Sequence, residues 1–507
     1  MADERAKGED MAGSSRLKGS GAPKGTHLVG SGDIPALLAN ARDTFSDLPG
    51  EIVELAEIFS QAGEEIALVG GPVRDAFLGL SPNDFDLTTS ARPEKTEELL
   101  DQWATKVWTV GREFGTIAAR RHGLEVEVTT YRVEEYQEDS RKPQVAYGDS
   151  LEGDLSRRDF TINAVAMRLP QMVMVDPFDG LEDLAQGILR TPISAEQSFR
   201  DDPLRIMRAA RFAAQLGVDV SPDVMAAMED ERERLEIVSA ERIRTELEKL
   251  ILSKYPRRGL ELLVYTGVAD LVLPELSGLA ETVDEHGRHK DVYQHTLTVL
   301  EQAIDLETGP DGPVPGPDFV LRFAALMHDV GKPATRRFVG NQVTFRHHDV
   351  VGAKMTRKRM QALKFDKATT NAVSDLVAKH LRFHGYGDQA WTDAAVRRYV
   401  TDAGDQLERL HRLTRADSTT RNRRKALRLS AAYDDLEERI VALRSKEELD
   451  AVRPDLSGEE IMEVLDLKPS PQVGEAYRFL LDLRLEEGPL GKTEATKRLT
   501  DWWASRN

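Results

Sequence analysis

The sequence predicts an α+β protein in which a head with a mixed β-sheet precedes mostly α-helical regions. Short apolar runs and alternating segments, typical of strands, lie between residues 66 and 131. From about residue 184 onward, apolar residues instead recur at the three- and four-residue spacing of helices. A chain of 507 residues is long enough for about three domains or more. We expect a head at 47–183, a helical neck at 184–275, a histidine-rich domain at 276–430 and a helical tail at 431–507.

The composition is that of an ordinary globular protein, with 40% hydrophobic and 31% charged residues. Cysteine is absent, which excludes a disulfide framework and Cys-ligated zinc and fits a reducing cytoplasm. No apolar run approaches the ~18 residues of a membrane span, so we expect no membrane partner. The net charge of −19 disfavours a generic polyanion binder, and a nucleic-acid partner would therefore need local basic patches.

The N-terminal region, residues 1–46, is rich in Gly, Ser, Ala and Lys without periodicity, which predicts a disordered tail. Its lysines could contact RNA, although a plain disordered tail is the simpler interpretation. The apolar spacing of Leu48–Ala62 predicts a helix ahead of the first strand.

A glycine pair follows the first predicted strand, Ile66–Val69. Gly70 and Gly71 lack side chains, so backbone N–H groups can approach a phosphate closely. Pro72 suits the first turn of a helix, which we expect at Val73–Leu78. A helix N-terminus behind two glycines is a typical anion-binding arrangement.

Two aspartates follow on the next predicted strand, Asp84-Phe85-Asp86. Because side chains alternate along a strand, Asp84 and Asp86 share one face and Phe85 points the other way. Two such carboxylates can hold two divalent ions about 3.5–4 Å apart, which suits phosphoryl transfer. Acidic residues number 87 of 507, so an isolated pair of this kind is more often a solvated strand face.

The whole string from Ile66 to Thr89, IALVGGPVRDAFLGLSPNDFDLTT, is much more specific than the aspartates alone. It resembles the signature of class II nucleotidyltransferases in the DNA polymerase beta-like superfamily, which include tRNA CCA-adding enzymes and bacterial poly(A) polymerases. The resemblance implies a DNA polymerase beta-like head in which Asp84 and Asp86 are catalytic and hold Mg²⁺. It also assigns nucleotide binding to Gly70, Gly71 and Arg74.

The segment after these aspartates predicts further elements of the same sheet. Pro93–Trp103 has helical spacing, whereas Lys106–Ala119 and Glu125–Tyr131 alternate like strands. Relatives often carry an acidic residue at the position of Glu127, so this side chain is either a third carboxylate near the metals or a surface glutamate. The charged, aperiodic segment Glu134–Ala146 predicts a loop, and CCA-adding enzymes have a flexible loop here that helps to switch base choice.

A second signature, RRDFTINA, matches the family pattern R-R-D-F-T-x-N-A at every specified position. Arg157 and Arg158 can bind a triphosphate in bidentate fashion. Asp159 or Asn163 can bond the ribose hydroxyls. The next segment, Asp176–Leu184, is similar to the family's turn out of the head.

The string beginning at Asp201, DDPLRIMR, resembles the family's nucleotide-template motif E-D-x-x-R, with Asp201 in place of Glu. Asp202 and Arg205 are three residues apart, which predicts one shared helix face. A carboxylate beside a guanidinium accepts from the amino group and donates to the ring nitrogen of cytosine or adenine, and rejects uracil and guanine. Arg208 extends the pattern. An ordinary salt bridge is the alternative interpretation.

Helical spacing continues through Glu241–Leu252 and Arg258–Thr266 in the neck. Near the C-terminus, Leu456–Gly488 predicts two helices around a Pro-rich turn, similar to the tail of CCA-adding enzymes although Lys468–Pro471 lacks the usual glycine.

Arg415–Arg428 carries six basic residues, which could face an RNA backbone or could equally form a solvated helix face.

Histidines are concentrated in the region that follows the neck. An adjacent His-Asp pair closes an apolar helix, and further histidines and a distant aspartate offer imidazole and carboxylate ligands without thiolate. This pattern resembles the HD phosphohydrolase domain, which implies a second divalent ion of unknown identity. The resemblance assigns the metal positions to His295, His328, Asp329, His348, His380 and Asp417. His347 competes with His348, and the Asp-Val-Val-Gly that follows favours His348.

The resemblance extends roughly from Leu48 to Gly491. It implies an enzyme that adds CCA to the 3′ end of tRNA without a nucleic-acid template, using CTP and ATP. The RNA 3′-hydroxyl would attack the α-phosphate and release pyrophosphate.

Three alternatives remain open. Poly(A) polymerases have a Gly-Arg-Arg-Phe-like stretch where this chain has Gly111-Arg112-Glu113-Phe114, which favours the CCA type. A CC-adding enzyme would have a shortened flexible loop, and this loop is full length. The third alternative is an HD phosphohydrolase whose head only regulates it, which the intact Asp84 and Asp86 disfavour.

Overall fold

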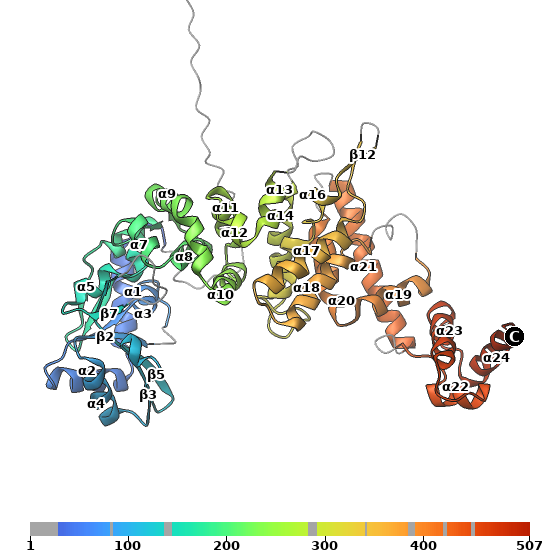
Figure 1. Cartoon of the computed structure of the whole chain (residues 1–507), viewed down its shortest axis with the longest axis horizontal. Helices are drawn as coiled ribbons and strands as arrows, with labels where there is room; N and C mark the ends of the chain where they lie inside the picture. Colours follow the sequence, from blue (N-terminus) through green and yellow to red (C-terminus); the bar gives the residue numbers. More distant parts are fainter. Residues whose placement is uncertain are drawn as a thin grey trace, which may run out of the picture. The chain divides into compact units, whose positions relative to one another are not determined.

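The computed structural model describes residues 29–81, 85–135, 144–281, 292–339, 342–383, 391–418, 423–447 and 452–506. Asp84 and part of the predicted flexible loop, residues 136–143, lie outside these ranges. The chain forms two compact units, Met1–Ser198 with Val218–Val224, and Phe199–Gly217 with Met225–Asn507. The first unit contains the sheet, and the second is mainly helical (Figure 1). The predicted fold class is therefore confirmed.

The N-terminal prediction is wrong for part of its range, because α1 (Ile34–Ser46) is a helix. Asp33 caps it by accepting a hydrogen bond from the Ala36 amide. Leu37, Ala41 and Phe45 recur every four residues and are buried. This spacing gives the helix an apolar stripe that ties it to the head.

Among the described residues, the head sheet has seven strands in the order β3-β4-β5-β2-β1-β8-β9. They are β1 (Ile66–Val69), β2 (Phe85–Thr89), β3 (Lys106–Trp108), β4 (Thr116–Arg121), β5 (Leu124–Thr130), β8 (Ala166–Leu169) and β9 (Val173–Val175). β2 and β5 pair in parallel, whereas the other neighbours are antiparallel, so the sheet is mixed as predicted.

The predicted strand Lys106–Ala119 is interrupted, which differs from the expectation of one alternating segment. A short 3₁₀ turn, η2 (Arg112–Phe114), separates β3 from β4. Gly115 follows it at φ 77°, a left-handed conformation that glycine adopts without strain. Similarly, the predicted loop begins and ends as paired strands, β6 (Arg132–Glu135) and β7 (Gln144–Tyr147).

Helices cover both faces of the head sheet. α2 (Gly50–Gln61) and α4 (Pro93–Trp103) pack together on one face, where Phe85, Leu87, Val126 and Val128 are buried. On the other face, α5 (Leu151–Ser156) contributes Leu151 and Leu155 to a core with Ala67 and Val69. The remaining elements of this unit are α3 (Gly71–Phe77), η3 (Thr161–Asn163), α6 (Gly180–Gln186), β10 (Ile188–Leu189) and β11 (Asp219–Val220).

The chain passes between the units at three points, inside α7 (Ala195–Asp201), after Gly217 and inside α9 (Pro222–Glu231). The head thus extends beyond the predicted border at residue 183. The neck elements of the second unit are α8 (Leu204–Leu216), η4 (Arg232–Ile237), α10 (Ala240–Ile251), α11 (Pro256–Tyr265), α12 (Ala269–Val272) and α13 (Pro274–Ala280). A buried ion pair between Arg211 and Glu246, 2.5 Å apart, joins α8 to α10.

The histidine-rich region is a helical bundle with one small hairpin. Its elements are α14 (Val292–Asp305), α15 (Phe319–Met327), α16 (Lys332–Thr335), β12 (Arg337–Val339), β13 (Gln342–Thr344), α17 (His348–Ala362), α18 (Lys367–Lys379), α19 (Asp393–Ala403), η5 (Gly404–Gln406) and α20 (Leu407–Asp417). α15 packs against α14, α18 and α20. It is buried over almost its full length, so the side chains after its last turn lie inside the bundle.

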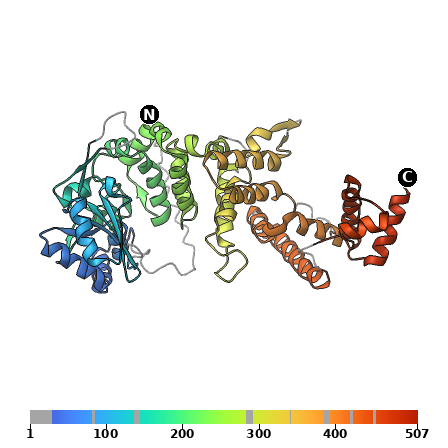
Figure 2. The same cartoon turned by 60° about the horizontal axis from the view of Figure 1, so that its bottom comes forward.

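The predicted border at residue 430 falls inside one continuous helix, α21 (Arg423–Lys446). The tail continues with α22 (Gly458–Leu465), α23 (Pro471–Glu487) and α24 (Lys492–Ala504), which lie side by side around a small core (Figure 2). Ser457 and Glu460 form a capping box at the start of α22. No helix in the described ranges has the length and apolar character needed to cross a membrane.

Candidate functional site

The head presents two carboxylates side by side on neighbouring strands. Asp86 on β2 is exposed, and Phe85 on the opposite face is 5% exposed, which agrees with the predicted alternation. Glu127 on β5 is the register partner of Asp86 and is also exposed. Because β2 and β5 are parallel and adjacent, both side chains project from the same face. Carboxylate oxygens are the ligands that Mg²⁺ prefers, so this pair fits the implied ion.

The glycine pair lies between β1 and α3, as predicted. Gly70 has φ 74°, which a residue with a side chain rarely adopts. A Cβ at this position would also come within 3.2 Å of Arg158 Nη1. Glycine therefore leaves room for the Arg158 guanidinium beside the turn, and the first and second signatures meet there.

A chain of hydrogen bonds links the remaining head residues of the two signatures. Arg74 donates from Nη1 to Asn163 Oδ1 over 2.8 Å. Asn163 donates from Nδ2 to Asp159 Oδ1 over 3.0 Å. Asp159 and Asn163 are buried, so this network holds the second signature against α3. The structure thus brings together side chains that are 89 residues apart in the sequence.

Asp154, which no sequence motif above identifies, orients both arginines of the second signature. It lies on α5 and is 1% exposed. Oδ1 is 3.3 Å from Arg157 Nε, and Oδ2 is 3.3 Å from Arg158 Nη2. Thr88 of the carboxylate strand also donates to Oδ2 over 3.2 Å. The available signal was the spacing, since residues three and four apart on a helix are neighbours.

The pKa of Asp154 reflects these contacts. Burial by itself would raise it, but the charges of Arg158 and Arg157 and the hydrogen bond from the Arg132 amide hold it below its ordinary value. Asp154 is therefore ionised at neutral pH. A buried carboxylate that stays charged keeps the two guanidinium groups close to α5.

The turn at the end of the head, Asp176–Leu184, packs against the second signature. Asp176 accepts hydrogen bonds from the amides of Gly180 and Leu181 and so begins α6. A Cβ at Gly180 would meet the Thr161 carbonyl oxygen at 2.1 Å, closer than any side chain can approach. Glycine is thus required where α6 packs on η3.

The predicted geometry of the template residues is wrong in one respect. Asp202 lies between α7 and α8 and not on a helix face shared with Arg205, because Pro203 interrupts the helical hydrogen bonding. Asp202 Oδ1 accepts from the Leu204 amide over 3.1 Å, and Oδ2 lies 3.6 Å from Arg242 Nη2. Arg205 is on α8 and 7% exposed. Arg208 lies on the same helix.

A cluster of histidines and aspartates forms around the end of α15, in the region predicted to bind metal. The Nδ1 atoms of His328, His348 and His380 each lie 2.7–2.8 Å from the backbone carbonyl three residues earlier. A carbonyl oxygen only accepts, so Nδ1 carries the hydrogen and Nε2 of the neutral ring is free to bind a metal. His328 Nε2 is buried and faces the carboxylates of Asp329 and Asp417, at 3.2 Å and 3.4 Å.

The six predicted ligands form two groups. His295, His328 and Asp417 offer ligand atoms within 4.8 Å of one another, as do Asp329, His348 and His380. Asp329 lies between the groups: Oδ2 is 3.2 Å from His328 Nε2, and Oδ1 is 3.3 Å from His348 Nε2. Imidazole and carboxylate donors that converge in this way fit divalent metal ions.

His348 rather than His347 contributes to this cluster. His347 is exposed, has φ 64° and precedes α17, whereas His348 Nε2 is 3.2 Å from His380 Nε2. Lys332, which no sequence motif above identifies, places its Nζ 2.6 Å from Asp329 Oδ2. Its signal was the three-residue spacing from Asp329.

The charges in the cluster balance one another. Burial lowers the pKa of His328, but the carboxylates of Asp329 and Asp417 outweigh it and raise the pKa to about 10. Burial raises the pKa of Asp329, but His328 and Lys332 hold it well below its usual range. Burial and the charge of His328 together lower the pKa of His380 to about 4. A metal ion would take the place of the His328 proton as the positive charge between the carboxylates.

Three parts of the chain match known protein families. Residues 66–190 match the Poly A polymerase head domain. Residues 217–279 match a probable RNA- and SrmB-binding site of polymerase A, and residues 292–422 match the HD domain. The first match covers the glycine pair, Asp86 and the second signature, and the third contains all six residues of the metal cluster.

The fold is also that of solved CCA-adding enzymes. The chain is similar to the CCA-adding enzyme of Bacillus stearothermophilus in complex with CTP, with a TM-score of 0.65 and 24% identity over 90% of this chain and 98% of the other. It is similar to the Thermotoga maritima CCA-adding enzyme complexed with tRNA, with a TM-score of 0.58 and 18% identity over 92% and 98% of the two chains.

Curated relatives share more of the sequence. The A-adding tRNA nucleotidyltransferase of Deinococcus radiodurans is 33% identical over 450 residues, which cover 86% of this chain and 95% of that protein. The CCA-adding enzyme of Streptococcus sanguinis is 43% identical over 235 residues, 46% of this chain and 57% of that protein. With a relative matched over almost its full length, the chain belongs to the class II tRNA nucleotidyltransferases.

Proposed function

We propose that the protein adds CCA to the 3′ end of tRNA from CTP and ATP and releases pyrophosphate. The observation that carries the proposal is the arrangement of the head, where Asp86 and Glu127 share one sheet face and Arg158 lies beside the glycine turn. Two-metal phosphoryl transfer needs carboxylates that hold the ions and cations that bind the triphosphate.

Each part of the site has a role in this reaction. Asp84 and Asp86, with Glu127, would hold Mg²⁺, which neutralises charge on the triphosphate. Arg157 and Arg158 would bind the phosphates, and Asp154 would keep both guanidinium groups oriented. The incoming nucleotide would then lie with its α-phosphate near the carboxylate pair, where the RNA 3′-hydroxyl attacks.

Asp202 and Arg205 would select the base. A carboxylate oxygen accepts from the amino group of cytosine or adenine, and a guanidinium donates to the ring nitrogen. Although the two side chains do not share a helix face, their backbones are joined by the hydrogen bond from the Arg205 amide to the Asp202 carbonyl, 3.0 Å long. This bond would keep the carboxylate and the guanidinium at a fixed spacing.

The A-adding relative makes A-only addition the main alternative. The two are separated by incubating the purified protein with all four nucleotides and either a tRNA lacking CCA or the same tRNA ending in CC. Sequencing of the products should show CCA on the first and A on the second. Addition to the CC-ended tRNA alone would establish A-only activity, and long adenosine runs would indicate a poly(A) polymerase.

We further infer that the HD domain is a metal-dependent phosphohydrolase. The supporting observation is the convergence of His295, His328, Asp329, His348, His380 and Asp417, with the Nε2 atoms of His328, His348 and His380 directed into the cluster. Bound ions would polarise a phosphoryl oxygen and lower the pKa of a water. The test is hydrolysis of phosphomonoesters and of 2′,3′-cyclic nucleotides by the chelated protein after addition of Mg²⁺, Mn²⁺, Co²⁺ or Ni²⁺.

A further inference from the structure

One segment of this acidic chain is strongly basic. Residues 332–367 contain ten Lys and Arg against two Asp and Glu, a net charge of +8, whereas the whole chain carries −19. The segment comprises α16, the β12–β13 hairpin, all of α17 and the start of α18. A polyanion that binds this protein would therefore meet a favourable charge here, even though the average charge is repulsive.

Most cations of this segment are not paired with an acidic side chain in the described part of the chain. Three are held inside the fold: Lys332 by Asp329, Arg357 by Asn371 and Arg359 by Glu275. The other seven form no ion pair among the residues that the structure describes, and all but the half-buried Arg336 are exposed. These seven, which we call the basic face, are Arg336, Arg337, Arg346, Lys354, Lys358, Lys364 and Lys367.

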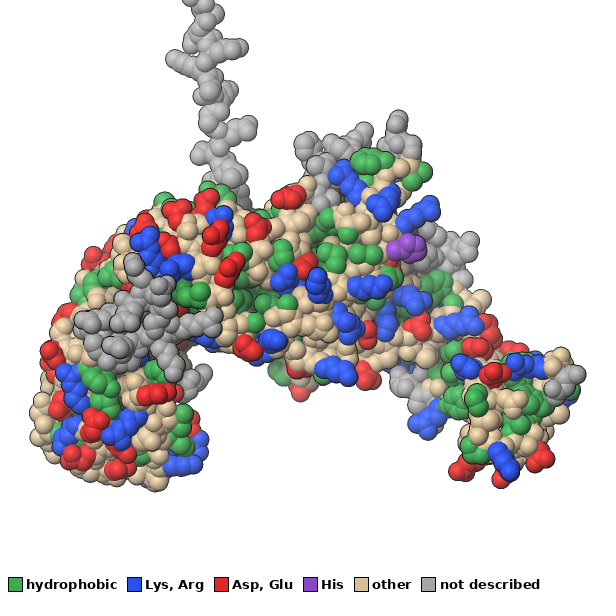
Figure 3. All heavy atoms as spheres, in the orientation of Figure 1, with side chains coloured by type: hydrophobic (Ala, Val, Ile, Leu, Met, Phe, Trp, Pro, Cys, Tyr) green, Lys and Arg blue, Asp and Glu red, His purple; other side chains and the backbone are tan. Residues whose placement is uncertain are grey.

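The elements that carry the basic face pack closely together. The chain from the hairpin runs directly into α17, and a Cβ at Gly331 would meet the carbonyl oxygen of His348 at 2.1 Å. This contact packs the chain ahead of α16 closely on α17. Lys354 and Lys358 are one turn apart and so project from the same side of α17. Figure 3 shows Lys and Arg side chains gathered on one face over this region and the hairpin.

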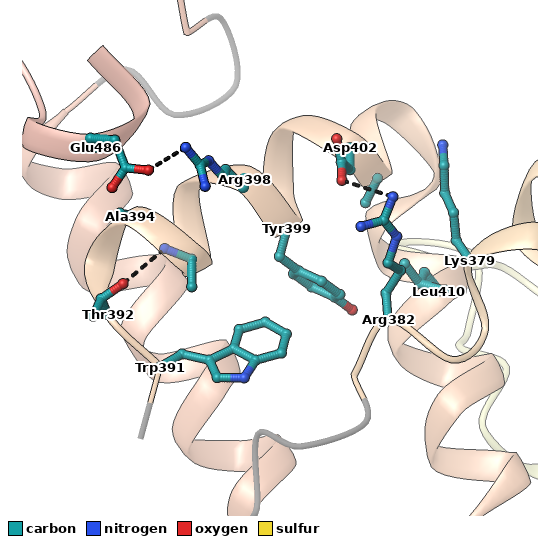
Figure 4. Close-up of a pocket in the computed structure, with 12 residues that line it drawn as sticks. Lys379, Arg382, Trp391, Thr392, Ala394, Arg398, Tyr399, Asp402, Leu410 and Glu486 are labelled. Carbon is teal, nitrogen blue, oxygen red and sulfur yellow. Dashed lines mark hydrogen bonds and ion pairs between the residues drawn. The ribbon is translucent and has the colours of Figure 1, made fainter. Parts of the chain in front are cut away.

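Several other arginines of the same unit differ because an acidic side chain pairs with each of them. Arg415, in the second basic stretch of the sequence, pairs with Asp434 and Glu437. A pocket of about 270 Å³ beside α19 contains two arginines, but Arg382 pairs with Asp402 and Arg398 pairs with Glu486 (Figure 4).

We propose that the basic face binds the phosphate backbone of the RNA substrate; this rests on the proposed function, which supplies the RNA. Cations that are not paired with an acidic side chain can replace the counterions of a phosphate chain, and the release of those ions favours binding. Phe338, 71% exposed with the Arg336 guanidinium 5.2 Å from its ring centre, adds a surface on which an unpaired base could stack.

An acidic protein is a poorer fit to this face. Protein interfaces have an apolar centre from which charged residues are depleted. Here the large apolar side chains that are exposed are Phe338, Val339 and Val350, and the Arg336 guanidinium lies over the Phe338 ring. The chemistry of the face is therefore that of a surface for a polyanion.

The test compares two doubly substituted full-length proteins. Lys354→Gln with Lys358→Gln removes two charges from the basic face, and Arg382→Gln with Arg398→Gln removes two charges from the pocket. All four side chains are exposed, and circular dichroism checks that both proteins fold. The dissociation constant of a tRNA lacking CCA is measured between 50 and 200 mM salt, together with KM for CTP.

For the basic-face variant we expect about 10-fold weaker tRNA binding, with the slope of log K against log salt reduced by about 1.5. The KM of this variant for CTP should remain at the wild-type value. The pocket variant should keep the wild-type tRNA affinity, salt slope and KM for CTP. Unchanged tRNA affinity and slope in the basic-face variant would overturn the inference, as would equal losses in both variants. Failure of the proposed function is distinct, because the wild type itself would then add nothing to tRNA.

Discussion

Asp86 and Glu127 are register partners on the parallel strands β2 and β5, and both side chains are exposed on one face of the sheet. A strand fixes its side chains rigidly, so the two carboxylates keep a constant spacing. The pair therefore offers oxygen ligands to a divalent ion from two separate parts of the chain. Glu127 would then act as a metal ligand and not only as a solvated surface residue.

The first prediction concerns these carboxylates. Asp86→Ala, and likewise Asp84→Ala, should abolish nucleotide addition in a folded protein, because each removes a metal ligand. Glu127→Gln should lower kcat by about 10- to 100-fold. Glu125→Gln, two residues away on the same face, is the matched control and should keep full activity. A loss of only a few-fold in Asp86→Ala would exclude this face as the metal site.

The second prediction concerns Asp154 as a positioning residue. Asp154→Asn should raise KM for CTP and ATP more than it lowers kcat, because Arg157 and Arg158 lose their shared anion. It should also cost about 2 kcal/mol of stability at pH 7. Glu152→Gln on the same helix is the control, since Glu152 is exposed. Equal KM values in the two variants would show that Asp154 has a purely structural role.

The pH dependence of the same substitution follows from the lowered pKa of Asp154. A carboxyl whose folded-state pKa is depressed stabilises the protein above its unfolded pKa of about 3.8, and this contribution is lost as the pH falls through the folded value. The difference in urea midpoint between wild type and Asp154→Asn should therefore shrink as the pH is lowered from 4 toward 2. A constant difference over that range would contradict the assigned shift.

The third prediction tests base selection. Asp202→Asn should increase misincorporation of UTP and GTP relative to CTP and ATP, because an amide can flip and donate to a carbonyl. Arg205→Ala should reduce the use of both CTP and ATP. The measurement is kcat/KM for all four nucleotides on a tRNA primer, with Asp230→Asn on the exposed side of α9 as the control. Unchanged base ratios in Asp202→Asn would contradict the assignment of Asp202 to base selection.

The fourth prediction concerns the number of ions in the HD domain. Because Asp329 directs its two oxygens at different histidines, we expect two Mn²⁺ ions per domain, coupled through a shared carboxylate in the electron paramagnetic resonance spectrum. His348→Ala should lose one ion, and the neighbouring His347→Ala should lose none. Nucleotide addition should stay within twofold of wild type in both. A single ion in the wild-type domain, measured by elemental analysis, would contradict the two-group geometry.

Local patterns predicted individual elements well. The strand Ile66–Val69 and the helix Pro93–Trp103 have the predicted bounds, because burial and helix-starting residues act over a few neighbouring positions. The helix Ile34–Ser46 differs from the predicted disordered tail. Leu37, Ala41 and Phe45 carry its helical spacing, but the residues in front of them are rich in Gly and Ser, which favours disorder.

The sequence by itself determined which chemical groups this protein contains, because motif spacing identifies carboxylates, arginines and histidines without any coordinates. Only the tertiary structure decided which of them meet. Glu127 became the neighbour of Asp86 through strand pairing, and Asn163 became the partner of Arg74 through the packing of η3 against α3. His348 rather than His347 joined the cluster because α17 begins after a left-handed residue. Such contacts connect residues far apart in the chain, and no local pattern encodes them.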